Sequence, residues 1–388
     1  MTTPVFDPVS IPVFDTGTTA RRRRSAKWRT HPADVLPMFV AEMDVALAPP
    51  VQRVLADAVA ASDTGYAVAL PELGQALAGF TERRWGWTVD PEWVAPVPDV
   101  GVGMVEVLRL LGAAGRPVVF SPPVYPPFWN WVTEVGAHAV EVPLTDDGSW
   151  RLDLPALERA FAQRPAAYLL CNPHNPVGRV PDAAELAALV ELATRYGVPL
   201  VSDEIHAPLT LPGETFTPLL TVPGAADVAL ALVSASKAFN LAGLKCAAVV
   251  AGSAPMHAVL TRMPPDVRWR AGHLGVLASV AAFTDGDAWL DGLRGALADR
   301  FDTLGQLLAE QLPQVRWCRP QATFLAWLDC RAVGEGDAPF QRFLQRGRVA
   351  VEPGTRFGAP GSGFVRLNVG TSHELLTEGV ARMAAALR

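Results

Sequence analysis

Three short apolar segments of this chain each end directly in polar residues. The segments and the polar residues that follow them are 166–171 with Asn172 and Asn175, 198–202 with Asp203, and 227–233 with Ser234, Ser236 and Lys237. Helical patterns such as 181–196 lie between them, and this βα alternation from about residue 97 to 283 predicts an α/β fold with a mostly parallel, doubly wound sheet. Such sheets bind ligands outside the carboxyl ends of their strands, so we expect these polar residues to share one site.

Lys237 is prominent because the chain uses lysine rarely. Only three of its 33 basic residues are lysines, and two of them, Lys237 and Lys245, lie eight positions apart. An arginine guanidinium stays protonated, whereas a lysine amine in a desolvated site can lose its proton and condense with an aldehyde. The pattern favours a nucleophilic role for Lys237, although codon bias alone is an alternative explanation.

The polar residues at the strand ends match the needs of pyridoxal 5′-phosphate (PLP). This cofactor requires a lysine amine, a phosphate cradle and an acid facing its ring nitrogen. Lys237 offers the amine, Ser234 and Lys245 can hold a phosphate, and Asp203 can pair with the protonated pyridine nitrogen. For Asp203 the alternative is a helix cap after the strand.

Two further polar side chains fit the same site. His206 could reach the phenolic oxygen of the cofactor, or it could be a buried histidine with satisfied hydrogen bonds. Asn175 lies in a turn with two Asn-Pro steps, and the residue before a proline is kept out of the α region. We expect this turn to offer the Asn175 amide to a cofactor oxygen or a substrate carboxylate. A plain turn explains the prolines, but not the order Asn, Asp, Lys at three strand ends.

The order of these motifs resembles that of fold-type I PLP enzymes, the class I/II aminotransferase superfamily. Within it, the chain is similar to the MalY/PatB-like cystathionine β-lyase or C–S lyase subgroup, over nearly its whole length. The motifs that carry the resemblance are Phe39-Val-Ala-Glu-Met-Asp44, residues 84–93, Pro123-Val-Tyr-Pro-Pro-Phe128, Asn172-Pro-His-Asn-Pro-Val-Gly178, Asp203-Glu-Ile-His206, residues 234–245 and Phe364-Val-Arg-Leu-Asn-Val-Gly370.

The resemblance implies a role for each site residue. It implies that Lys237 forms the imine with the cofactor, that Asp203 pairs with the pyridine nitrogen and that Tyr125 stacks on the ring. Asn175 and His206 would contact the phenolic oxygen. The phosphate would be held by Ser234, Ser236, Lys245 and the amides of Val100 and Gly101, before a helix that we expect from about Met104.

The resemblance also implies a substrate clamp and a partner subunit. Arg366 would bind the substrate α-carboxylate, with Asn175, a bidentate task suited to guanidinium. Tyr66 would reach the phosphate from the neighbouring subunit, so we expect a homodimer with shared sites. Two positions depart from the family pattern. Asp99 stands where a glycine is usual and would repel phosphate unless it points away, and residues 269–273 differ near the expected position of the substrate side chain.

The predicted function is that of a PLP-dependent carbon-sulfur β-lyase that acts on an amino-acid substrate. It would cleave cystathionine or cysteine S-conjugates to a thiol, pyruvate and ammonia. The alternatives are a PLP-dependent aminotransferase, which shares the α-proton abstraction, and a regulatory PLP protein that binds a transcription factor.

The length of 388 residues is sufficient for two domains. We expect an N-terminal arm at 1–48 that packs with a smaller C-terminal α+β domain at 285–388, and a large PLP-binding domain at 49–284. The smaller domain would hold a long helix to about residue 312, strands near 315 and at 324–328, a helix near 339–345, the strand of Arg366 and a terminal helix.

Charge and composition limit the partners. The net charge of −6 argues against nucleic acid, and the Arg21–Arg24 run in the arm is expected to be solvated or packed in a dimer. No apolar run reaches the ~18 residues that a membrane span needs. The first residues lack the apolar core of a signal peptide, and the cysteines have no metal-site spacing. We therefore expect a cytoplasmic protein without a membrane partner or a metal.

Overall fold

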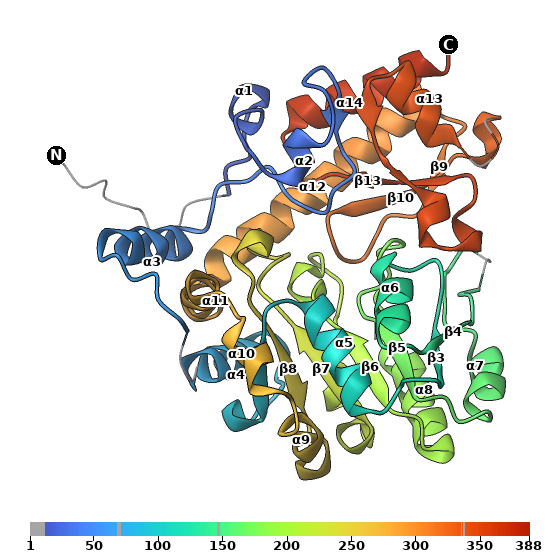
Figure 1. Cartoon of the computed structure of the whole chain (residues 1–388). Coiled ribbons are helices and arrows are strands. Elements are labelled where there is room, and N and C mark those ends of the chain that lie inside the picture. Colours follow the sequence, from blue (N-terminus) through green and yellow to red (C-terminus); the bar gives the residue numbers. More distant parts are fainter. Residues whose placement is uncertain (1–11, 68–70, 146–147, 335, 337) are drawn as a thin grey trace.

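The computed structural model describes residues 12–67, 71–145, 148–334, 336 and 338–388. Its centre is a seven-stranded sheet with the strand order β2-β8-β7-β6-β5-β3-β4 (Figure 1). The five strands from β7 to β4 pair in parallel, and β8 is antiparallel to both of its neighbours. The strands are β2 (Val94–Val97), β3 (Pro117–Phe120), β4 (His138–Glu141), β5 (Ala167–Cys171), β6 (Leu200–Asp203), β7 (Ala229–Val233) and β8 (Ala247–Ala251). This confirms the predicted mostly parallel α/β sheet.

Helices cover both faces of this sheet (Figure 1). Every residue of strands β5 to β8 is buried, as expected for strands between two helix layers. The helices of this part of the chain are α3 (Pro49–Ala60), α4 (Pro71–Trp85), α5 (Val100–Leu110), α6 (Pro127–Glu134), α7 (Leu154–Phe161), α8 (Ala183–Tyr196), α9 (Ala254–Leu260), α10 (Pro265–Trp269) and α11 (His273–Asp285).

A second, smaller sheet lies in the C-terminal part of the chain. Its four strands have the order β12-β13-β10-β9 and are antiparallel. The long helix α12 runs from beside the first sheet to this part, which forms the upper half of the view (Figure 1). The elements here are α12 (Asp287–Gln311), β9 (Arg316–Trp317), β10 (Leu325–Asp329), α13 (Pro339–Gln345), β11 (Val349–Ala350), β12 (Glu352–Pro353), β13 (Phe364–Asn368) and α14 (His373–Ala386).

The N-terminal arm lies with the C-terminal part. Strand β1 (Leu36–Pro37) pairs in parallel with β11, after the short helices α1 (Gly17–Ala20) and α2 (Ala26–Arg29). In the basic run of the arm, Arg23 forms an ion pair with Asp15 and Arg21 donates to the Ala33 carbonyl. The exact boundaries at 48/49 and 284/285 stay predictions.

Helix α5 begins four residues earlier than the sequence predicts. Asp99 is its N-cap, and the Asp99 carboxylate accepts a hydrogen bond from Val102 N at 2.8 Å. This cap outweighs the low helix propensity of the two glycines that follow. Gly103 lets the helix pack closely on the sheet, since a Cβ there would lie 2.8 Å from the side chain of Leu232.

The described residues contain neither a membrane-spanning helix nor a cluster of metal ligands. Within these ranges, no helix is long and apolar enough to cross a membrane. The same residues contain no group of three or more His, Cys, Asp or Glu side chains placed to hold a metal ion.

Candidate active site

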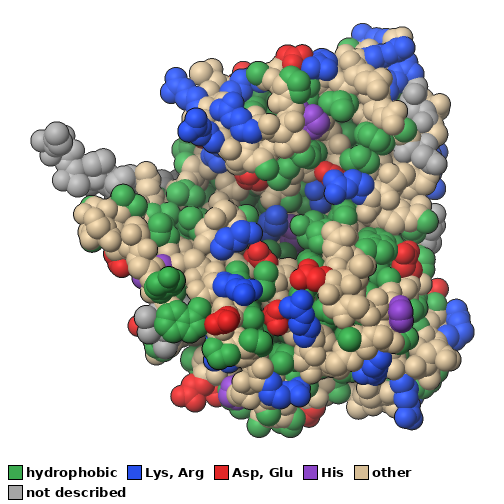
Figure 2. Space-filling model, in the orientation of Figure 1, with side chains coloured by type: hydrophobic (Ala, Val, Ile, Leu, Met, Phe, Trp, Pro, Cys, Tyr) green, Lys and Arg blue, Asp and Glu red, His purple; other side chains and the backbone are tan. Residues whose placement is uncertain are grey.

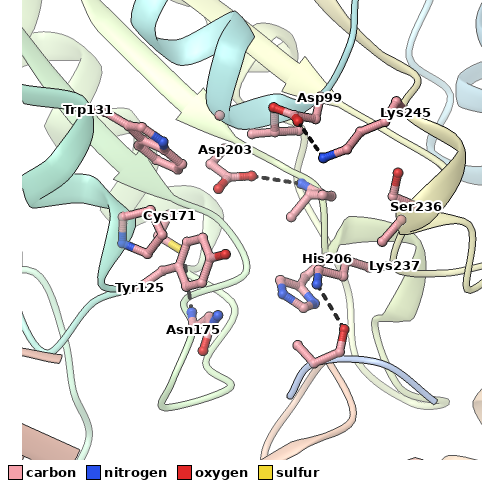
Figure 3. Close-up of a pocket in the computed structure, with 16 residues that line it drawn as sticks. Asp99, Tyr125, Trp131, Cys171, Asn175, Asp203, His206, Ser236, Lys237 and Lys245 are labelled. Atoms are coloured by element: carbon pink, nitrogen blue, oxygen red, sulfur yellow. Dashed lines mark hydrogen bonds and ion pairs between the residues drawn. The ribbon is translucent and has the colours of Figure 1, made fainter. Parts of the chain in front are cut away.

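A cavity of about 240 Å³ lies at the carboxyl ends of the parallel strands. Figure 2 shows a recess near the middle of one face of the molecule, with basic and histidine side chains at its floor. The residues that line the cavity are Ala41, Asp99, Val100, Gly101, Tyr125, Pro127, Trp131, Cys171, Asn175, Asp203, Ile205, His206, Ser236, Lys237, Ala242 and Lys245 (Figure 3). Nine of the twelve residues predicted for the site are therefore brought together here.

Lys237 reaches the cavity from the turn after β7. Its Nζ donates a 2.9 Å hydrogen bond to the carbonyl oxygen of Ala41 (Figure 3). Burial lowers the pKa of Lys237 to about 8, helped by the positive charge of Arg366 and opposed by Asp203. About one tenth of this amine is therefore unprotonated at pH 7, far more than for a solvated lysine of pKa ~10.4, and a nucleophile or general base requires this form.

Asp203 is the last residue of β6. Its Oδ1 accepts a 3.2 Å hydrogen bond from Ile205 N, and a 3-10 turn, Ala207–Leu209, follows instead of an α-helix. Burial raises the pKa of Asp203 to about 6, an effect that Ile205 N and Lys237 partly oppose. A cation placed against this carboxylate would stabilise its ionised form, as a pyridinium nitrogen would.

Asn175 and Arg366 meet at the side of the cavity. Arg366 Nη1 donates to Asn175 Oδ1 at 3.0 Å, and Nη2 donates to the Phe39 carbonyl at 2.9 Å. Arg366 is buried, lies over the ring of Phe357 and does not itself line the cavity. Its Nε has no hydrogen-bond partner among the described residues. Part of the guanidinium is therefore unpaired close to the cavity wall.

His206 is buried in the cavity wall and is not satisfied. Its Nδ1 has no hydrogen-bond partner in the described part of the chain. Burial, with the charges of Lys237 and Arg366, holds its pKa well below the usual value, so the ring is neutral. The alternative of a core histidine with satisfied hydrogen bonds is therefore disfavoured. The unpaired Nδ1 is available for a hydrogen bond with a ligand.

The amino terminus of α5 forms one end of the cavity. A Cβ at Gly101 would lie 3.0 Å from Trp131 Nε1 and 3.3 Å from Asp99 Oδ1, so only glycine leaves this space open. Lys245 Nζ lies 3.0 Å from Asp99 Oδ2. Asp99 therefore does not point away from the cavity. It lines the wall, where its carboxylate caps the helix and pairs with the lysine.

Three predicted residues lie outside the cavity lining. Arg366 is behind Asn175. Ser234 is buried beneath Ser236, with its Oγ 2.7 Å from the Cys246 carbonyl and 2.8 Å from Ser236 Oγ, so Ser236 is the serine that faces the cavity. Tyr66 is 82% exposed and contacts the ring of Trp269, which is 53% exposed. Their roles toward a ligand stay predictions.

The sequence did not reveal Trp131 and Cys171. Trp131 lies one helical turn after Pro127, and both line the cavity, so the i, i+4 spacing in α6 was the available signal. Cys171 ends β5, and burial raises the pKa of its thiol well above the usual value. A protonated thiol is a poor nucleophile, so burial disfavours covalent chemistry at Cys171, which shapes the cavity wall.

The donor set of this cavity fits PLP. It combines an amine of lowered pKa, a carboxylate that gains from a cationic partner, an unsatisfied histidine and a helix amino terminus with a glycine that leaves space for an anion. Tyr125 adds an aromatic ring to the wall. The fit has one complication, since Asp99 already neutralises Lys245.

Comparisons with known proteins agree with this reading. The sequence matches the family "aminotransferase class I and II" over residues 45–383. The chain belongs to this family. A Mycobacterium leprae protein provisionally named cystathionine beta-lyase is 47% identical, over 94% of this chain and 95% of its own length. The cystathionine beta-lyase PatB of Bacillus subtilis is 35% identical, over 91% and 93%.

A solved structure gives the same picture of the fold. It comes from Corynebacterium diphtheriae and is described, provisionally, as a PLP-dependent beta-cystathionase. It superposes with a TM-score of 0.91 at 34% identity and covers 96% of this chain and 98% of its own. These relatives confirm the resemblance to the cystathionine β-lyase subgroup of the class I and II aminotransferases.

Proposed function

We propose that this chain is a PLP-dependent carbon-sulfur β-lyase. It cleaves cystathionine or another cysteine S-conjugate to a thiol, pyruvate and ammonia, with consumption of one water. The observation that carries the lyase over the aminotransferase is the similarity, over at least nine-tenths of the chain, to proteins named cystathionine beta-lyase. The site itself suits either reaction, because both begin with removal of the α-proton.

The proposed roles follow from the geometry of the cavity. The bound cofactor supplies an electron sink for the negative charge that forms at the α-carbon. Lys237 would hold the cofactor through its amine, and the free amine would remove the α-proton of the substrate. Its lowered pKa keeps part of the amine ready to accept that proton. Arg366 and Asn175 bind the substrate carboxylate and orient the α-hydrogen toward Lys237.

The remaining residues hold the cofactor. Asp203 receives the ring nitrogen, and His206 Nδ1, which has no partner among the described residues, is available to a ring substituent. The amides of Val100 and Gly101 bind the phosphate with Ser236 and Lys245. Ser234 supports Ser236 from behind, 2.8 Å away.

The proposed enzyme is a homodimer in which Tyr66 completes the site of the partner subunit. Two exposed aromatic rings in contact, Tyr66 and Trp269, support this proposal. Tyr66 also borders a groove between α3 and α11 that is lined by Val276, Leu277 and Val280. Leu277 and Val280 are only half-buried there, and apolar side chains left partly open to solvent are typical of a protein interface.

The test is the release of pyruvate from L-cystathionine by the PLP-loaded protein without added keto acid. The Lys237→Ala protein is the control for breakdown caused by free cofactor. A lyase produces pyruvate and homocysteine in equal amounts. If the substrate is consumed only when a keto acid is present, the protein is an aminotransferase and the proposal is wrong.

A further inference from the structure

Residues 39–43, which we call the strap, contribute Ala41 to the cavity wall without forming a helix or a strand. Backbone carbonyls that are removed from water need hydrogen-bond partners. Because the strap has no strand neighbour, side chains of distant elements provide them. The acceptors and donors are Phe39 O with Arg366, Val40 O with Asn368, Ala41 O with Lys237, Glu42 O with Asn368 and Lys27, and Met43 O with Asn240 and Arg23.

Asn240 makes the most complete of these contacts. Its Oδ1 accepts from Met43 N at 2.9 Å and its Nδ2 donates to Met43 O at 2.8 Å. It therefore binds both backbone groups of one residue, as a neighbouring strand would. Asn240 has φ of 59°, in the left-handed region, which asparagine tolerates better than most residues.

The position of Asn240 connects the strap to the lysine. It lies three residues after Lys237, in the same turn, and the strap returns to that turn through the hydrogen bond from Lys237 Nζ to Ala41 O. Residues 41–43 are thus connected to residues 237–240 twice, by the hydrogen bond of Lys237 with Ala41 and by those of Asn240 with Met43. Loss of the Asn240 link would leave the position of the Ala41 carbonyl to the remaining contacts.

We propose that Asn240 is a positioning residue of the reaction, which holds the strap over the cavity and keeps the Ala41 carbonyl against the Lys237 amine. This inference rests on the proposed function, because it gives Lys237 the role of base. The strap has two effects on that amine. It directs the amine through a hydrogen bond, and it excludes water from it.

The charges around Lys237 determine the expected effect of loosening the strap. Asp203 on β6 and Glu42 in the strap favour the ammonium form, Arg366 on β13 disfavours it, and His206 is neutral. Burial is the largest cause of the lowered pKa. When the strap moves away, water replaces the carbonyl as the acceptor and solvates the ammonium. The carboxylate of Glu42 moves away with the strap and its effect is lost, but burial is the larger cause, so we expect the pKa of Lys237 to rise.

Two substitutions of Asn240 test this inference. Asn240→Gly keeps the left-handed backbone and removes both hydrogen bonds. Asn240→Asp keeps the shape and the acceptor, but it places an oxygen against the Met43 carbonyl. Arg164→Gly is the matched control, because Arg164 also has a positive φ of 50° and is exposed, outside the cavity lining.

The first measurement is the pH dependence of Lys237 modification by an amine-reactive reagent in the full chain freed of cofactor. Peptide mass spectrometry resolves it easily, since the chain has three lysines and Lys27 is in a buried ion pair with Asp44. We expect the midpoint to lie near pH 8 in the unsubstituted protein. In Asn240→Gly the midpoint should rise by about one unit, toward the ~10.4 of a solvated lysine. In Asn240→Asp the new carboxylate also favours the ammonium form, so the glycine variant decides the test.

The second measurement is steady-state kinetics of the PLP-loaded enzyme. We expect kcat to fall about tenfold with little change in KM, because the base is misdirected while the carboxylate clamp is intact. A lower melting temperature with an unshifted midpoint would show a merely structural role and overturn the inference. Absence of pyruvate release by the unsubstituted enzyme would instead refute the proposed function and leave the midpoint result standing.

Discussion

Arg366 Nη1 donates a 3.0 Å hydrogen bond to Asn175 Oδ1, which is 191 residues away in the sequence. The contact joins β13 of the small sheet to the turn after β5 of the large sheet at the edge of the cavity. The second nitrogen of the fork, Nη2, binds the Phe39 carbonyl. The guanidinium is therefore held in one orientation before any substrate arrives, which lowers the entropic cost of binding a carboxylate.

Replacement of Arg366 by lysine should weaken substrate binding far more than cofactor binding. Lysine keeps the charge but cannot bind Asn175, Phe39 and a carboxylate together. We expect kcat/KM to fall roughly 30-fold. This corresponds to a loss of about 2 kcal/mol in transition-state stabilisation, which is typical of a charged hydrogen bond. The control is Arg356→Lys, where an exposed arginine pairs with Glu352. Unchanged kinetics in Arg366→Lys would remove this residue from the substrate site.

Replacement of Lys237 should abolish covalent cofactor binding. Alanine has no amine, and arginine in Lys237→Arg keeps a positive charge that does not form an imine. Borohydride reduction followed by mass spectrometry should add the cofactor to the unsubstituted chain and to Lys245→Ala, but to neither Lys237 variant. Covalent cofactor in Lys237→Ala would assign the attachment to another amine.

Because of Glu204, the free energy of unfolding of the cofactor-free protein should decrease as the pH rises from weakly acidic to neutral. It is buried beside Asp203, and its Oε2 has no hydrogen-bond partner among the described residues. Burial raises its pKa from 4.5 to about 7. Between pH 4.5 and 7 the folded chain holds a proton that the unfolded chain releases, so the free energy of unfolding falls as the pH rises. The cost of ionising buried Glu204 is therefore absent below pH 4.5 and complete above pH 7.

The substitution Glu204→Gln removes that ionisation and keeps the shape. At pH 8 we expect it to stabilise the chain by about 1–3 kcal/mol, the cost of an uncompensated buried polar group, and at pH 4 to change little. Thermal unfolding of the cofactor-free protein at both pH values measures this. Glu191→Gln, at an exposed position of α8, is the control. Equal effects of Glu204→Gln at pH 4 and pH 8 would contradict the ionisation argument.

The sequence was sufficient to predict the large sheet and the centre of the site. Apolar segments of five to seven residues alternate with helical patterns, and parallel strands bring their carboxyl ends to one edge of the sheet. The residues Asn175, Asp203 and Lys237 therefore had to lie close together, and all three line the cavity. Helix α5 begins earlier than the sequence predicts, because the Asp99 cap outweighs Gly101 and Gly103, which disfavour a helix.

The contacts of the strap could not be predicted. Most of them join residues 39–43 to side chains about 200 to 330 positions away, and the strap has no periodic pattern that reveals its partners. The direction of Ser234 was also beyond the sequence, since spacing in a tight turn does not say which hydroxyl faces the cavity. The partner of Tyr66 requires a second copy of the chain.

A mixture of two inactive variants should test whether Tyr66 serves the site of its neighbour. In a heterodimer of Lys237→Ala and Tyr66→Ala chains, one site carries both changes and the other has Lys237 and Tyr66 intact. Random reassembly of equal amounts should therefore restore about one quarter of the sites. Activity after mixed refolding, with sedimentation to show dimers, is the measurement. Dimers without recovered activity would exclude a shared site.

Replacement of Asp99 should show whether this carboxylate weakens the binding of the cofactor phosphate to Lys245. Asp99 Oδ2 lies 3.0 Å from Lys245 Nζ, so the acid competes with a bound phosphate for the same cation. Asp99→Asn retains a side-chain oxygen to cap α5 and removes the negative charge. We expect several-fold tighter PLP binding, corresponding to about 1 kcal/mol for a partly exposed ion pair, measured by cofactor dissociation in dilute protein. The gain should shrink at high salt, where exposed charges are screened. Weaker binding in Asp99→Asn would mean that the acid is needed to hold Lys245 in place for the phosphate.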